Sequence, residues 1–180
     1  MRKCFLFLAV ALALVGFPSF VSAQGEIAIE SVNVQFWPEF DKAEMLVINS
    51  ISLSESTKLP VRFNVRIPAD SALHTVAVGK SSESVSDQGV EKTMEKDGDW
   101  LVVSINVTGP AIRLEYYDPG LKKDGDQRSY SYHWLSDYGA ANFGVLLQKP
   151  FDAEQFKTSL SLRYGHPEPM APGVVRLVAP

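Results

Sequence analysis

Residues 97–118 read DGDWLVVSINVTGPAIRLEYYD, the clearest pattern in the chain. Apolar side chains stand at every second position through 101–107 and again through 112–116. A period of two is typical of a β-strand with one buried face. Thr108, Gly109 and Pro110 interrupt the alternation. The pattern therefore predicts two strands joined by a short turn and paired antiparallel at the centre of a sheet.

The same alternation recurs along the chain. It predicts further strands over 32–36, 45–53, 61–67, 73–78, 90–94, 129–135, 143–147 and 159–163, with 174–178 as an edge strand. Residues 96–99 predict a hairpin turn, because Asp-Gly tolerates positive φ. Helical pattern is confined to one turn over 151–156. Apart from the edge strand, these roughly eight to ten short strands predict an all-β fold, an antiparallel β-sandwich of immunoglobulin-like or jelly-roll-like type, with a barrel as the alternative.

The first 23 residues have the features of a secretory signal peptide. Arg2 and Lys3 precede an apolar run, and Val-Ser-Ala at 21–23 predicts cleavage after Ala23. An uncleaved anchor helix is the alternative, but the run is short for a membrane span. The sequence thus predicts a signal peptide over 1–23, a β-sandwich domain over 24–164 and a proline-rich tail or linker over 165–180. We expect the protein to be secreted or held in the cell envelope.

Composition narrows the classes of partner. The single cysteine, Cys4, lies in the predicted signal peptide, so we expect no disulfide in a domain large enough to fold without one. Of 17 basic residues, Arg2 and Lys3 leave with the signal peptide, so 15 basic residues face 21 acidic ones and the net charge is −6. This charge disfavours nucleic acid and anionic membranes as partners. We expect no transmembrane helix in the mature chain.

The sequence supplies little catalytic chemistry. Three histidines lie outside the predicted signal peptide, none at metal-ligand spacing: His74, His133 and His166. A Gly-x-Ser-x-Gly nucleophile motif is also missing. Asp118, Asp124 and Asp126 lie in one turn-rich stretch and offer calcium its preferred ligands, but their spacing fits no calcium motif. We predict solvated turns there, no catalytic residue, no metal site and no cofactor.

Aromatic side chains are the remaining candidates for ligand binding: Trp37, Trp134 and Tyr138. A flat, exposed ring can stack on a sugar ring. The period-two spacing of Tyr130, Tyr132 and Trp134 favours a buried position for these three. Trp37 and Tyr138 stand near loops, which leaves a surface role more open to them.

Three segments resemble a known group of proteins: FWPEFD at 36–41, DWLVV at 99–103 and LEYYD at 114–118. Over roughly residues 26–162 the chain is similar to uncharacterised exported bacterial β-sandwich domains, which are often tethered to the envelope by a helix after the domain. The resemblance implies a fold and a location, and no activity. Because the sequence shows no such helix, we expect a truncated or a freely secreted chain.

Three functions remain open, since a fold alone does not fix a function. The first is a non-catalytic module for protein interaction or adhesion at the cell envelope, whose partner is an envelope or extracellular protein. The second is a carbohydrate-binding module that uses exposed aromatic rings. The third and weakest is a secreted hydrolase, which needs a convergent polar cleft.

Overall fold

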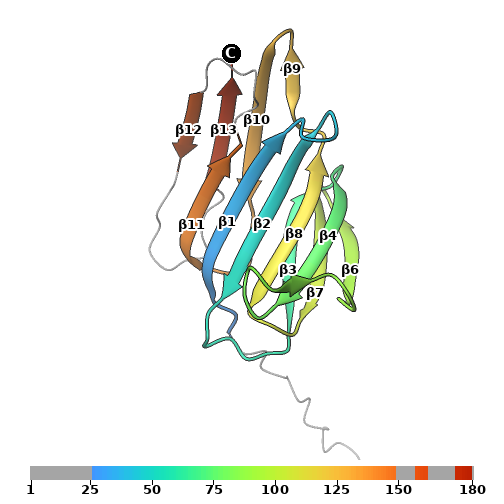
Figure 1. The fold of residues 1–180 in the computed structure, drawn as a ribbon, viewed down its shortest axis with the longest axis vertical. Helices are drawn as coiled ribbons and strands as arrows, with labels where there is room; N and C mark the ends of the chain where they lie inside the picture. The colour runs from blue at the N-terminus through green and yellow to red at the C-terminus, as the bar shows by residue number, and fades with distance from the viewer. Residues whose placement is uncertain (1–25, 149–156, 162–172, 180) are drawn as a thin grey trace, which may run out of the picture.

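A computed structural model describes residues 26–148, 157–161 and 173–179, which form strands and no helix. Five strands run side by side in Figure 1 and, with a short sixth strand, form a sheet in the order β11 (Ala140–Leu147), β1 (Ile29–Pro38), β2 (Met45–Leu53), β8 (Ala111–Asp118), β4 (Ala72–Gly79), β5 (Val85–Ser86). A second sheet has the order β12 (Lys157–Ser161), β13 (Gly173–Ala179), β10 (Gln127–Trp134), β9 (Lys122–Asp124). A third has the order β3 (Val61–Pro68), β7 (Trp100–Val107), β6 (Lys92–Asp97). The all-β prediction is confirmed.

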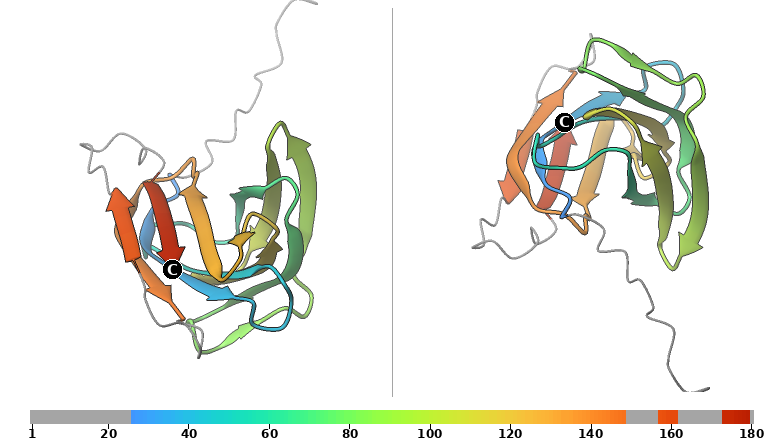
Figure 2. Two further views of the ribbon diagram at one scale, coloured as in Figure 1. Left: turned by 90° about the horizontal axis from the view of Figure 1, so that it is seen from above. Right: turned by 90° about the horizontal axis from the view of Figure 1, so that it is seen from below.

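The pairing is antiparallel with one exception among the described strands. β1 and β11 are parallel, with Val34 opposite Val145. β2 lies between β1 and β8. The three sheets surround a common interior (Figure 2).

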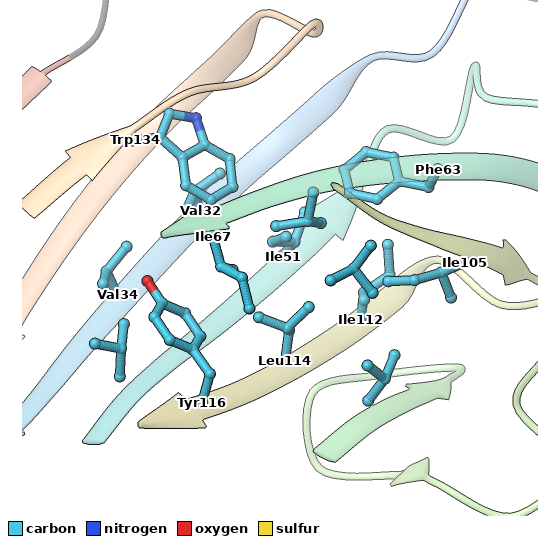
Figure 3. Close-up of a cluster of buried hydrophobic side chains, with 14 of the residues drawn as sticks. Val32, Val34, Ile51, Phe63, Ile67, Ile105, Ile112, Leu114, Tyr116 and Trp134 are labelled. Carbon is cyan, nitrogen blue, oxygen red and sulfur yellow. The ribbon is translucent and has the colours of Figure 1, made fainter. Parts of the chain in front are cut away.

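Alternate side chains from all three sheets fill this interior. Figure 3 shows Val32 and Val34 of β1, Ile51 of β2, Phe63 and Ile67 of β3, Ile105 of β7 and Leu114 of β8 directed into one cluster. The ring of Phe36 lies 5.6 Å from that of Tyr130 and 4.9 Å from that of Tyr132, so β1 packs on β10. The predicted inward faces of these strands are confirmed.

The predicted pairing of residues 101–107 with 112–116 is wrong. β7 pairs with β3 and β6, whereas β8 pairs with β2 and β4. Residues 108–110 therefore carry the chain from one sheet to another. A Cβ on Gly109 would lie 2.3 Å from the carbonyl oxygen of Gly79, so this crossing packs directly against the end of β4.

Two smaller differences concern the second half of the chain. Residues 122–126, expected to be a loop, form β9 and the turn of a hairpin with β10, and Gly125 has a φ of 55° there. The strand predicted over 174–178 is present as β13, but it lies between β12 and β10 and not at an edge. The predicted signal peptide and the predicted helical turn over 151–156 lie outside the described residues.

Candidate binding face

The outer face of the six-stranded sheet brings together side chains from strands that are far apart in the sequence. Val32, Val34 and Phe36 of β1 point inward, so their neighbours Ser31, Asn33, Gln35 and Trp37 face outward. The register continues these rows across the sheet. Asn33 stands opposite Ser50, which stands opposite Arg113, and Trp37 stands opposite Leu46, which stands opposite Tyr117.

Apolar side chains gather at one end of this face. The Trp37 indole N–H donates to Oε1 of Gln35 at 3.3 Å, and the Phe40 ring meets the Trp37 ring edge-on at 4.8 Å. Leu146 of β11 stands opposite Gln35. Phe40 is 56% exposed and Leu146 is 55% exposed. We call Trp37, Phe40 and Leu146 the apolar patch.

A polar cluster borders the apolar patch and holds the β1–β2 turn in place. The Tyr117 hydroxyl donates to Oδ2 of Asp41 at 2.8 Å, and the Lys42 ammonium lies 3.7 Å from the centre of the Tyr117 ring. The hydrogen bond to Asp41 raises the pKa of the Tyr117 hydroxyl. The His74 ring meets the Tyr117 ring edge-on at 5.6 Å. The contacts of Asp41 and Lys42 with Tyr117 thus fix the turn that carries Phe40.

A polar groove of about 240 Å³ occupies the other end of the face. Its lining includes Ser31 and Asn33 from β1, Ser50 and Ser52 from β2, Arg113 from β8, and Ser82 and Val85 from the segment after β4. The Arg113 guanidinium donates to the Ser82 carbonyl oxygen at 3.2 Å, which ties that segment to the sheet.

Trp134 does not belong to this face. Its side chain is 3% exposed and lies 6.0 Å from the Phe143 ring, inside the core (Figure 3). A ring that stacks on a sugar must be accessible, so the ligand-binding role suggested for Trp134 lacks its main requirement. Trp134 continues the alternation of Tyr130 and Tyr132 along β10, so all three side chains point inward.

Tyr138 lies at the edge of the third sheet, away from Trp37. Its ring stacks on Phe63 at 4.8 Å, and its hydroxyl accepts the backbone N–H of Asn64 at 3.2 Å. Burial raises the pKa of this hydroxyl. The neighbouring Asp137 pairs with Arg66 at 2.6 Å. Residues 137 and 138 therefore cover the edge of β3, and the Tyr138 hydroxyl satisfies one of its backbone N–H groups. An uncovered edge strand would be open to pairing with another strand.

The acidic stretch that offered calcium its ligands has a different arrangement. Asp118 is buried, and its carboxylate accepts the Tyr130 hydroxyl at 2.6 Å and the Gly120 backbone N–H at 2.8 Å. Asp124 and Asp126 are exposed on the β9–β10 hairpin. Over residues 26–148, 157–161 and 173–179, no three His, Cys, Asp or Glu side chains gather as metal ligands would. The prediction of a solvated turn is wrong for Asp118.

Sequence reasoning found Trp37 and missed the rest of the face. Phe40 stands in a turn, and Leu146 and Arg113 lie on strands far along the chain. The alternation of 111–118 did place Arg113 on the side opposite Leu114, but nothing in the sequence indicated which serines would surround it.

In the described part of the chain, no helix is long and apolar enough to cross a membrane.

Comparison with known proteins adds no family to these observations. No protein-family model matches the chain. No curated protein matches it in sequence at a significant level.

Proposed function

We propose that the chain is a non-catalytic, exported module that binds another protein of the cell envelope or the extracellular space through the outer face of its six-stranded sheet. The observation that carries this proposal is the apolar patch. Phe40 and Leu146 are each more than half exposed to solvent, and Trp37 packs against Phe40. Exposed apolar patches bordered by polar residues mark interaction sites on soluble proteins.

The proposal includes the fold and the route of export. Packing of the six-stranded sheet over β10 and over β3 and β7 supports a β-sandwich, with the face described above on its outside. The features of residues 1–23 support export through a signal peptide. The binding face would then meet extracellular or envelope partners.

A glycan is the second candidate partner, and Trp37 favours it. Its ring is partly exposed on the same face as a groove lined with hydroxyl and amide groups, a combination that suits sugars. Against this, the Trp37 and Phe40 rings cross at 72°, so they offer no flat pair for stacking. We therefore place the protein partner first.

Photo-cross-linking in intact cells of the source organism tests the proposal. A photoreactive amino acid replaces Phe40 or Leu146 in the full chain, and Met94 on β6 serves as the matched control because it is equally exposed, at 55%. We expect adducts with the same protein from positions 40 and 146, and none from position 94. Adducts that are identical at all three positions, or missing at 40 and 146, contradict the proposal.

A second measurement separates the two candidate partners. The purified exported protein is passed over a panel of insoluble polysaccharides, together with its Trp37→Ala variant. Retention that the variant loses assigns the face to glycans. No retention, combined with specific adducts at positions 40 and 146, assigns it to a protein.

A further inference from the structure

We infer that the polar groove on the outer face binds a single carboxylate-bearing sugar, of the hexuronic acid class. This inference goes beyond the proposed function, because the groove shares no residue with the apolar patch. It concerns a small ligand, so it can be tested independently of any protein partner.

The walls of the groove are built before a ligand arrives. The segment after β4 turns back through a hydrogen bond from the Ser84 backbone N–H to the Ser81 carbonyl oxygen at 3.0 Å. A Cβ on Gly79 would lie 2.2 Å from the Ser84 carbonyl oxygen, so this segment rests directly on the strand. On the opposite side, a Cβ on Gly144 would lie 2.5 Å from Oδ1 of Asn33, so the glycine leaves room for that amide. A preformed site loses little entropy on binding.

The charge in the groove selects an anion. Arg113 is half-buried, and its single hydrogen bond among the described residues goes to a neutral carbonyl oxygen. No carboxylate of residues 26–148 forms an ion pair with it, whereas Arg66 and Arg128 both have such partners. A guanidinium presents several N–H groups in one plane and binds a carboxylate through two of them. The free part of the Arg113 fork is therefore suited to a ligand carboxylate.

The remaining lining selects hydroxyl groups. Within the part of the chain that the structure describes, the side chains of Ser31, Asn33, Ser50 and Ser52 have no hydrogen-bond partner. Serine hydroxyls and the asparagine amide both donate and accept, as sugar hydroxyls do. The volume of about 240 Å³ is below the range of drug-sized sites. Together these features fit one sugar unit whose carboxylate meets Arg113.

NMR titration of the exported protein with glucuronate, glucose and acetate tests the inference. We expect saturable shifts around Asn33 and Arg113 with glucuronate, with a dissociation constant on the order of 1 mM. Glucose and acetate should each bind at least about tenfold more weakly, since each satisfies only half of the groove. Equal binding of acetate and glucuronate overturns the sugar assignment. No saturable shift at these residues overturns the site itself.

Two variants and a control locate the site. Arg113→Gln should weaken glucuronate binding by about tenfold or more. Ser50→Asp places a carboxylate opposite Arg113 in the register, so it should block binding while leaving the fold intact. Arg62→Gln is the control, since Arg62 donates to Thr93 on a different sheet. An affinity unchanged in Ser50→Asp, or reduced equally in Arg62→Gln, overturns the inference. Failed cross-linking together with intact glucuronate binding removes only the proposed protein partner.

Discussion

Asp118 and Tyr130 form a buried polar contact in the core. A buried carboxylate is costly unless it accepts strong hydrogen bonds, and Asp118 accepts the Tyr130 hydroxyl and the Gly120 N–H. Burial and the nearby Asp118 charge raise the pKa of Tyr130 well above its ordinary value, so its hydroxyl remains a donor. This pair joins the end of β8 to β10.

Replacement of Tyr130 by phenylalanine should therefore destabilise the fold. The change leaves the Asp118 carboxylate with one donor fewer and should lower the free energy of unfolding by about 2 kcal/mol. Urea denaturation measures this loss. Tyr138→Phe is the control, because its hydroxyl only accepts an N–H at a half-buried edge, and its loss should be smaller. A larger loss for Tyr138→Phe would contradict this view of the core.

Glu39 connects two turns that are far apart in the sequence. Its carboxylate pairs with Arg128 and with Lys123, each at 2.7 Å, and so ties the β1–β2 turn to the β9–β10 hairpin. Hydrogen bonds from Arg128 and then Lys123 lower the pKa of Glu39 below the ordinary value of 4.5. Because the folded pKa lies below the unfolded one, the stabilisation is present above pH 4.5 and is lost as the pH falls through the folded pKa.

Glu39→Gln should accordingly be less stable than the parent protein near neutral pH, by a small amount because the contact is partly exposed to solvent. The difference should shrink well below pH 4.5, where the parent carboxylate is protonated. Urea midpoints of both proteins at about pH 7 and about pH 3 measure it. A difference that does not change with pH would show that the ion pairs contribute nothing.

β7 illustrates how one strand depends on its inward face. Val103, Ile105 and Val107 are buried in the common core, whereas Asn106 on the other side is exposed. Val103→Asp should abolish cooperative thermal unfolding, because it buries a charge without a partner. Asn106→Asp is the matched control on the same strand and should retain the transition. A Val103→Asp protein that melts like the parent would place this face outside the core.

The crossing from β7 to β8 depends on close backbone contact. A methyl group on Gly109 would meet the Gly79 carbonyl oxygen at 2.3 Å, so Gly109→Ala should cost about 1–3 kcal/mol of unfolding free energy. Gly139→Ala is the control, because a Cβ there meets nothing within 4 Å. Urea denaturation compares the two. A neutral Gly109→Ala would show that the two sheet ends are further apart.

For the molecule as a whole, we expect stability to be independent of divalent cations. Asp118 already accepts its hydrogen bonds from Tyr130 and Gly120, and it is buried away from the exposed Asp124 and Asp126. A chelator should therefore leave the thermal midpoint unchanged. A drop of several degrees, restored by calcium, would revive a calcium site on the β9–β10 hairpin.

Part of the candidate site could be predicted from the sequence, and part could not. Trp37 was identified because a tryptophan at a strand end near a turn stands out in the sequence. Phe40, Leu146 and Arg113 were missed because their significance arises from neighbours on other strands. Trp134 was misjudged as a ligand-binding residue, although its own alternation with Tyr130 and Tyr132 indicated burial.

The sequence by itself determined which side chains face the core. In an extended strand successive side chains point to opposite sides, so the alternation of 61–67 or 101–107 orients each residue without reference to any other segment. Only the tertiary structure decided which strands are neighbours. Residues 101–107 and 111–116 are adjacent in sequence yet lie in different sheets, and β1 pairs with the distant β11. Strand pairing depends on packing across the whole core, and the binding face on the outside of the sheet is a consequence of that pairing.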